Sequence, residues 1–284
     1  MYNILLALDN SDYSKQVINL GIEVAKNIDA KLNLLFVVEN KIIYHPFVPM
    51  VFNPVMDGFD FGDAYSGFYD KAKDKIKVYG KEILKKAGDD CKKNNIESVC
   101  FIREGILAEE IIDLSSENDL IIMGRYGVGV EHSNYLLGSA VEEVARMANK
   151  PLIISSEQIN GIENIALAFD NSEFANKTLR LAFWMKKVWK KELKFEIFSV
   201  VDNVDEADKM EEIIKGLISE HEDFSAKVLL SDSTEEMILS YIKENPIDLL
   251  MMGAYGHSRI RELILGSTTS SVIRKIGIPV LLNR

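Results

Sequence analysis

The segment ILLALDNSDYSK (residues 4–15) recurs as IALAFDNSEFANK (residues 165–177), and this recurrence sets the architecture. Each copy places an apolar run before Asp-Asn-Ser, then an acidic residue and an aromatic one, and a helical pattern follows. Internal repetition on this scale indicates two copies of one structural unit. The length of 284 residues agrees, because about 150 residues per domain predicts roughly two domains.

Further matching segments lie near the end of each half. The matching pairs are DLIIMGRYG (119–127) with DLLMMGAYG (248–256), and LLGSAVEEVARMANKPLIIS (136–155) with LILGSTTSSVIRKIGIPVLL (263–282). A polar stretch that carries Gly161 separates the two halves. We therefore predict two repeated domains, at residues 1–156 and 162–284.

The first half is about 30 residues longer than the second, and the extra length falls at about residues 41–70. This insertion holds Pro46, Pro49 and Pro54 and is dense in aromatic residues. A long irregular loop in a compact domain is usually either functional or disordered. Two interpretations stay open: a compact loop that covers the core, or a lid or partner surface.

Composition excludes several classes of protein. Hydrophobic residues make up 47% of the chain and charged residues 27%, as in a globular protein and unlike a disordered one. A net charge of −11 argues against a nucleic-acid binder, which needs a basic face. No apolar run reaches the roughly 18 residues of a membrane span. Cys91 and Cys100 match neither a metal site nor a redox pair, so we expect a reduced, cytoplasmic setting.

Short apolar runs alternate with longer amphipathic segments in both halves. Apolar strands alternating with helices predict a parallel sheet that is covered on both faces, and right-handed crossovers then give a doubly wound α/β unit. The expected strands are residues 4–8, 32–38, 98–102, 120–123, 151–154, 165–169, 194–200, 226–230, 249–252 and 279–282. The expected helices of the first half are residues 14–27, 71–93, 108–117 and 139–148.

Ligands of such sheets bind beyond the carboxyl ends of the strands, where the glycine motifs of this chain fall. In the second half, Gly253 and Gly256 follow a strand and allow a tight turn close to a ligand. The spacer after them carries His257, Arg259 and Arg261 and is locally basic, and we assign Arg259 to anion binding. These features predict an anion-binding loop.

A helix start completes this pattern in the second half. Gly266 precedes Ser267, Thr268 and Thr269, which offer free backbone amides, the positive end of a helix dipole and three hydroxyls. Phosphate is the anion that such a helix start favours. We therefore expect Gly266, Ser267, Thr268 and Thr269 to bind phosphates.

The first half departs from this pattern. Its spacer is one residue longer and contains Glu131, while Ala140 and Val141 replace two of the hydroxyl residues. By charge and donor count the second half should hold a triphosphate better, and the first site is weakened, altered or vestigial. The matching positions of the first half are Gly124, Gly127, Gly138 and Ser139.

Asp9 and Asp170 each follow a first strand and precede Asn-Ser. One interpretation is the N-cap of the next helix. The other is a carboxylate in the binding crevice, which accepts a ribose hydroxyl or approaches a metal ion such as Mg²⁺. Because the aspartate recurs in both halves, we give the two interpretations equal weight.

No catalytic residue can be assigned from the sequence. The four histidines form no pair at metal-binding spacing. No nucleophile elbow, Ser-His-Asp order or Walker-type Gly-Lys-Ser/Thr motif is present.

Both halves resemble the universal stress protein family, and the chain resembles a tandem two-domain member over nearly its whole length. The second half carries that family's ATP-binding pattern, G-x2-G-x9-G-[S/T], between the flanks DLLMMG and IPVLL. The resemblance implies a Rossmann-like, adenine-nucleotide α-hydrolase-like fold, in which a five-stranded parallel sheet holds ATP, or AMP or ADP, beyond its strands. It also implies that residues 151–154 and 279–282 pair as an internal pseudo-dimer; a homodimer of chains stays open.

The resemblance also assigns roles to single residues. Asp170 would lie near the ribose and phosphates, where it could hold Mg²⁺, and the backbone at Val200 and Met252 would frame the adenine. The residues around the phosphates would be Gly253, Gly256, Gly266, Ser267 and Thr269. The equivalent first-half positions are Asp9, Val37, Met123, Gly124, Gly127, Gly138 and Ser139.

Three functional hypotheses follow. The leading one is a cytoplasmic ATP-binding stress or regulatory protein with little turnover. The second is an enzyme that slowly hydrolyses ATP or transfers a nucleotidyl group, with Asp170 holding Mg²⁺. The third is a non-nucleotide module that binds an unknown protein partner through the fold and the aromatic insertion.

Overall fold

The computed structural model describes residues 1–39, 61–127, 138–156, 161–254 and 265–284. Within them, strands and helices alternate along the chain. The strands are β1 (Tyr2–Leu8), β2 (Ala30–Glu39), β3 (Ser98–Gly105), β4 (Leu120–Gly124), β5 (Leu152–Ser155), β6 (Asn164–Ala168), β7 (Lys194–Val201), β8 (Phe224–Leu230), β9 (Leu249–Gly253) and β10 (Val280–Asn283). The helices are α1 (Tyr13–Ile28), α2 (Phe61–Lys93), α3 (Leu107–Ser115), α4 (Ser139–Met147), α5 (Glu173–Val188), α6 (Val204–Ile218), α7 (Thr234–Glu244) and α8 (Ser267–Lys275).

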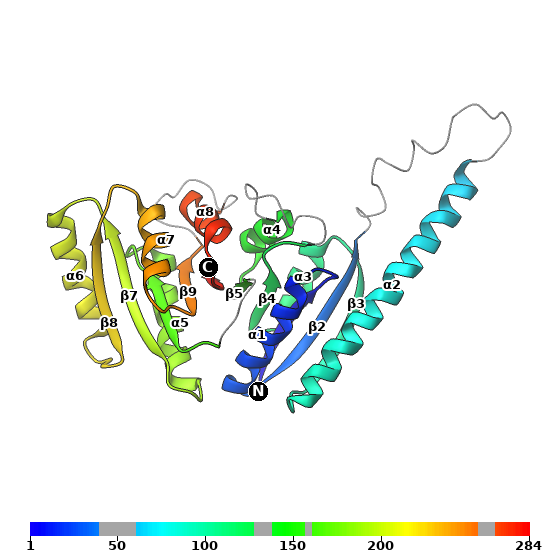
Figure 1. Ribbon diagram of the computed structural model, residues 1–284, viewed down its shortest axis with the longest axis horizontal. Coiled ribbons are helices and arrows are strands. Elements are labelled where there is room, and N and C mark those ends of the chain that lie inside the picture. Colours follow the sequence, from blue (N-terminus) through cyan, green and yellow to red (C-terminus); the bar gives the residue numbers. More distant parts are fainter. Residues whose placement is uncertain (40–60, 128–137, 157–160, 255–264) are drawn as a thin grey trace.

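All ten strands form one sheet in the order β3-β2-β1-β4-β5-β10-β9-β6-β7-β8. The pairings within each repeat are parallel, so each contributes a five-stranded parallel unit. Every expected strand is present, and the predicted fold class is confirmed. Figure 1 shows α2 beside β3 at one end of the sheet and α6 beside β8 at the other.

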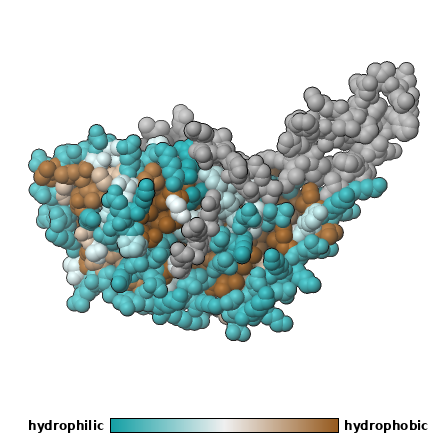
Figure 2. All heavy atoms as spheres, viewed as in Figure 1, coloured by the Kyte–Doolittle hydropathy of each residue, from teal (hydrophilic) through white to brown (hydrophobic). Residues whose placement is uncertain are grey.

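Helices cover both faces of the sheet, as its apolar strands require. In β1, Ile4, Leu6 and Leu8 belong to one core layer, while Leu5 and Ala7 belong to the other. Helices α1, α2, α5 and α6 pack on the first layer, and α3, α4, α7 and α8 pack on the second. Hydrophilic side chains cover most of the described surface in Figure 2, as expected where the apolar sides of helices meet a sheet.

The two repeats join through their last strands. β5 and β10 are antiparallel and pair Leu152 with Leu282, and Ile154 with Val280. The pairing that the family resemblance implies is therefore confirmed. Both core layers contain residues of both repeats, so the hydrophobic core is continuous across this junction.

The insertion in the first repeat is less irregular than expected. Helix α2 begins at Phe61, so residues 61–70 are helical and do not belong to a loop. No proline lies between Pro54 and Pro151, so proline does not prevent residues 61–70 from being helical. Residues 40–60 lie outside the described residues, so both interpretations of the insertion stay predictions. None of the described helices has the length and hydrophobicity needed to cross a bilayer.

Candidate functional site

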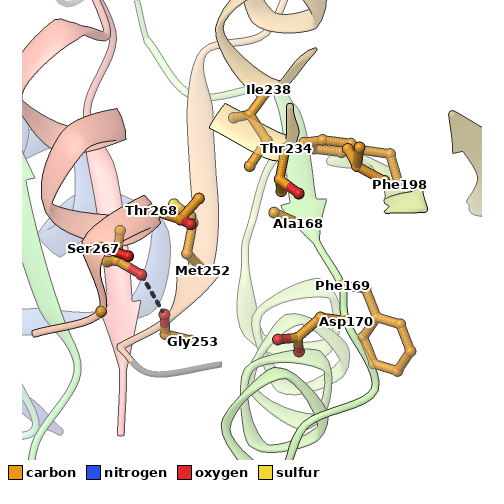
Figure 3. A pocket seen from close by; sticks show the side chains of 13 residues that line it. Ala168, Phe169, Asp170, Phe198, Thr234, Ile238, Met252, Gly253, Ser267 and Thr268 are labelled. Atoms are coloured by element: carbon orange, nitrogen blue, oxygen red, sulfur yellow. Dashed lines mark hydrogen bonds between the residues drawn. The ribbon is translucent and has the colours of Figure 1, made fainter. Parts of the chain in front are cut away.

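A cavity of about 300 Å³ lies at the carboxyl ends of the strands in the second repeat. Strand β6 ends beside it, Gly253 closes β9 there, and α8 begins there. The cavity is at the edge where an open α/β sheet binds its ligands. Its lining, shown in Figure 3, comprises Ala168, Phe169, Asp170, Phe198, Val200, Thr234, Ile238, Met252, Gly253, Gly266, Ser267, Thr268 and Thr269.

The helix start of α8 supplies one polar wall of the cavity. Gly266 is the N-cap residue, and no side chain in the described part of the chain caps it. The backbone amides of the first turn therefore have no partner within the helix. Ser267 and Thr268 add hydroxyls, while Thr269 Oγ1 donates to the Gly253 carbonyl oxygen at 3.5 Å (dashed line in Figure 3). Together these groups form a donor-rich wall suited to an anion.

Asp170 brings a carboxylate to the same polar end. Its Oδ1 accepts a hydrogen bond from the Ser172 amide at 3.0 Å. The N-cap of α5 is Ser172, whose Oγ accepts from the Ala175 amide at 3.2 Å, so Asp170 is not the capping residue. Figure 3 shows the Asp170 carboxylate facing across the cavity toward Gly253. Of the two sequence interpretations, a crevice carboxylate describes this geometry better.

The other end of the cavity is apolar. Phe198 and Ile238 are buried and face it together, with Thr234 at their side (Figure 3). Phe198, Thr234 and Ile238 were not predicted from the sequence. Phe198 stands two residues before Val200 on β7, hence on the same face of the strand. Thr234 opens α7, which follows β8 at the same edge of the sheet. Both placements could therefore have been inferred from the sequence.

A buried tyrosine supports this apolar wall from behind. The ring of Tyr241 lies 4.7 Å from that of Phe198, centroid to centroid. Burial, together with the nearby Glu196 carboxylate, raises the pKa of the Tyr241 phenol above its ordinary range. A tyrosine phenol is neutral at physiological pH, and this raised pKa keeps the phenol of Tyr241 neutral to higher pH than usual.

Gly253 and Gly266 are glycines for different reasons. A Cβ at Gly253 would lie 2.9 Å from the Cβ of Phe174, so this glycine lets α5 pack against the end of β9. Packing therefore gives a reason for this glycine that the sequence interpretation did not contain, while its place beside a ligand stays a prediction. Gly266 has φ −54° and ψ 140°, which any residue can adopt, and its Cβ would come no closer than 3.4 Å to a described atom. Within the described residues, the fold does not require a glycine at position 266.

The first repeat differs at the equivalent of Gly266. A Cβ at Gly138 would lie 3.0 Å from the Arg125 carbonyl oxygen, so packing restricts that position. Gly124 resembles Gly253, because its Cβ would lie 2.9 Å from the Cβ of Tyr13. Val37 and Met123 are buried, and Ser139 begins α4.

The carboxylate of the first repeat is held by its own loop. Asp9 Oδ1 accepts hydrogen bonds from the Ser11 amide at 2.9 Å, from Ser11 Oγ at 2.5 Å and from Ser14 Oγ at 2.8 Å. A Cβ at Gly127 would lie 3.3 Å from Asp9 Oδ2, so the glycine loop runs close to it. The second repeat has Ala175 where the first has Ser14, and the helix hydroxyl is absent there.

Some predicted site residues fall outside the described residues. Gly256 and Arg259 both lie in the undescribed stretch 255–264. Among the described residues, no group of three or more His, Cys, Asp or Glu side chains could hold a metal ion. The structure thus brings Asp170, Val200, Met252, Gly253, Gly266, Ser267, Thr268 and Thr269 to one cavity.

Comparisons with known proteins match both repeats. A model of the universal stress protein family matches residues 1–156 and residues 161–284. Universal stress protein Slr1230 from Synechocystis sp. is 30% identical over 296 residues, which cover 99% of each chain. A crystal structure of a universal stress protein from Archaeoglobus fulgidus has a TM-score of 0.75 at 22% identity, covering 99% of this chain and 98% of that one. The functionally unknown protein PA1789 from Pseudomonas aeruginosa has a TM-score of 0.67 at 12% identity, covering 100% and 92%.

Proposed function

The chain belongs to the universal stress protein family, and on that premise we propose that its second repeat binds ATP in the cavity beside α8. The protein is then a nucleotide-responsive regulator in the stress response, with little turnover. ADP and AMP fit the same site through fewer phosphate contacts.

Gly266 carries this proposal. Neither its backbone angles nor its described neighbours require a glycine, yet it stands at the uncapped start of α8, in the wall of the cavity. A ligand that approaches the first-turn amides closely supplies the missing reason, because a Cβ would block it. Phosphate is among the anions that a helix N-terminus binds through its free amides.

The two ends of the cavity fit the two ends of a nucleotide. The hydroxyls and amides from Ser267 to Thr269 would hold phosphates, while Phe198 and Ile238 would contact the base. Asp170 stands at the polar end, where it would accept from a ribose hydroxyl or hold Mg²⁺ together with the phosphates. A volume of about 300 Å³ is at the lower end of the range for small-molecule pockets.

The described lining favours binding over catalysis. Asp170 is its one carboxylate, and that lining includes no histidine, cysteine or lysine that could serve as a general base or nucleophile. We therefore expect bound ATP to persist.

A thermal-shift titration with ATP and Mg²⁺ tests the proposal. A ligand that binds only the folded state stabilises it by about 2.7 kcal/mol at a hundredfold excess over Kd. We expect the melting temperature to rise with ATP, and Gly266→Val to abolish the rise. Gly216→Val is the matched control, since Gly216 lies in α6, outside the cavity lining, and nothing in the described structure lies within 4 Å of a Cβ there. A wild-type melting temperature that ATP leaves unchanged would refute the proposal.

Slow ATP hydrolysis is the alternative that one observation favours, namely the Asp170 carboxylate at the cavity. Phosphate release by the wild type above that of Asp170→Ala would support it, and equal rates would remove it. The third hypothesis, a protein-interaction module, rests on an insertion that lies mostly outside the described residues.

A further inference from the structure

Arg125 of the first repeat reaches into the second. It follows β4 and is buried, and its Nη1 donates to the carbonyl oxygen of Ile276 at 2.5 Å. Its Nη2 donates to the carbonyl oxygen of Ile278 at 3.2 Å. In the sequence, Arg125 stands directly after Gly124, in the glycine loop of its own repeat. The structure instead aims its guanidinium at the other repeat.

These carbonyls mark the end of helix α8. Ile276 is its C-cap residue, and Ile278 lies in the turn that leads to β10. The last carbonyls of a helix lack partners within it and form the negative end of its dipole. A buried guanidinium is therefore a favourable partner there, and Arg125 fixes the end of α8 from the first repeat.

The opposite end of α8 is the polar wall of the cavity. The helix spans only nine residues, about 14 Å, so its two ends move together. Ser267, Thr268 and Thr269 line the cavity, and their placement depends on how the helix is held. We propose that Arg125 is a positioning residue that aims the start of α8 at the phosphates, which makes the first repeat part of the second repeat's site. This inference rests on the proposed function for the nature of the ligand.

A second contact runs in the opposite direction. Arg284 Nη1 donates to the carbonyl oxygen of Arg146, in the last turn of α4. The final helix of each repeat is thus capped by an arginine of the other repeat. The second repeat has Ala254 where the first has Arg125, so this position of the second repeat offers no guanidinium to α4. Arg284 is therefore a matched control: it makes the same kind of contact with the other helix.

Three variants separate positioning from general stability: Arg125→Ala, Arg125→Lys and Arg284→Ala. ATP affinity is measured by titration calorimetry, and backbone hydrogen exchange of α4 and α8 is measured in the nucleotide-free protein. We expect Arg125→Ala to weaken ATP binding about tenfold and to speed exchange at the start of α8. Arg125→Lys should recover part of both losses, because an ammonium can still cap one carbonyl. Arg284→Ala should leave ATP affinity unchanged and speed exchange in α4.

Two results would overturn the inference. One is wild-type ATP affinity and unchanged α8 exchange in Arg125→Ala. The other is an equal loss of ATP affinity in Arg284→Ala, which would indicate a general loosening of the junction. If the wild type binds no ATP, the proposed function fails separately, and the exchange of α8 alone decides whether Arg125 positions the helix.

Discussion

Val280 of β10 pairs with Ile154 of β5 in antiparallel register, so the last strand of each repeat hydrogen bonds to that of the other. An exposed strand edge invites pairing with another chain, and this junction removes two such edges. It also makes one sheet and two continuous core layers out of two repeats.

We predict that the two repeats unfold together, because separating them would break the sheet and open both core layers. Trp184 and Trp189 belong to the second repeat, but Trp184 packs against Tyr2 of the first, so their fluorescence reports on the second repeat and on its contact with the first. Far-UV circular dichroism reports on the whole chain. Urea transitions followed by the two signals should coincide. Separate midpoints would show that the repeats are independent units.

Replacing each of two glycines with alanine should separate packing from ligand binding. Gly253→Ala places a Cβ 2.9 Å from that of Phe174, so overpacking should lower the free energy of unfolding by about 1–3 kcal/mol. Gly266→Ala meets only ordinary contacts among the described residues, so its cost should stay below about 1 kcal/mol, the disadvantage of alanine against glycine at an N-cap. Chemical denaturation measures both. Equal destabilisation would remove the argument that a ligand explains Gly266.

Each chain should bind one nucleotide. The loop of the first repeat already engages Asp9 through Ser11 and Ser14, and packing restricts Gly138. Native mass spectrometry with ATP should therefore show a single occupied site. Asp170→Asn should weaken that binding, while the matched variant Asp9→Asn should not. Two sites of equal affinity, or sensitivity to Asp9→Asn alone, would contradict the assignment.

Tyr241 should make stability fall at alkaline pH. Burial, with the nearby Glu196 carboxylate, raises the pKa of the Tyr241 phenol above its ordinary value of 10.0. Folding therefore favours the neutral phenol. The resulting gain in the free energy of unfolding is fully present below pH 10. It is lost as the pH rises further, because the phenol then ionises in the unfolded chain before it does in the folded one. Urea midpoints at pH 8 and pH 11 should fall less for Tyr241→Phe than for the wild type.

Tyr79→Phe is the control for this experiment, because the Tyr79 side chain is 60% exposed. The urea midpoint of this variant should fall between pH 8 and pH 11 as much as that of the wild type. An alkaline decline of the same size in Tyr241→Phe and in the wild type would show that this phenol does not contribute.

The sequence predicted the strands, and the edge of the sheet at which the cavity lies, well because both depend on local, repeated signals. The run before Asp9 and its copy before Asp170 sufficed to place β1 and β6. The helical conformation of residues 61–70 was missed, because the aromatic residues there were assigned to the irregular insertion. The pairing of β5 with β10 came from the family resemblance alone.

Contacts between distant segments explain what the sequence could not provide. The reason for Gly253 lies in Phe174 of α5, which only the fold brings to the end of β9. The partner of Arg125 is 151 residues away in the chain, and no local pattern points to it.

A crystal structure of the protein grown with ATP and Mg²⁺ tests the central claim most directly. We predict nucleotide density in the second repeat alone, with phosphates against the amides at the start of α8 and the base beside Phe198 and Ile238. Density elsewhere in the molecule, or a cavity that stays empty or is filled by side chains at saturating ATP, would contradict the account.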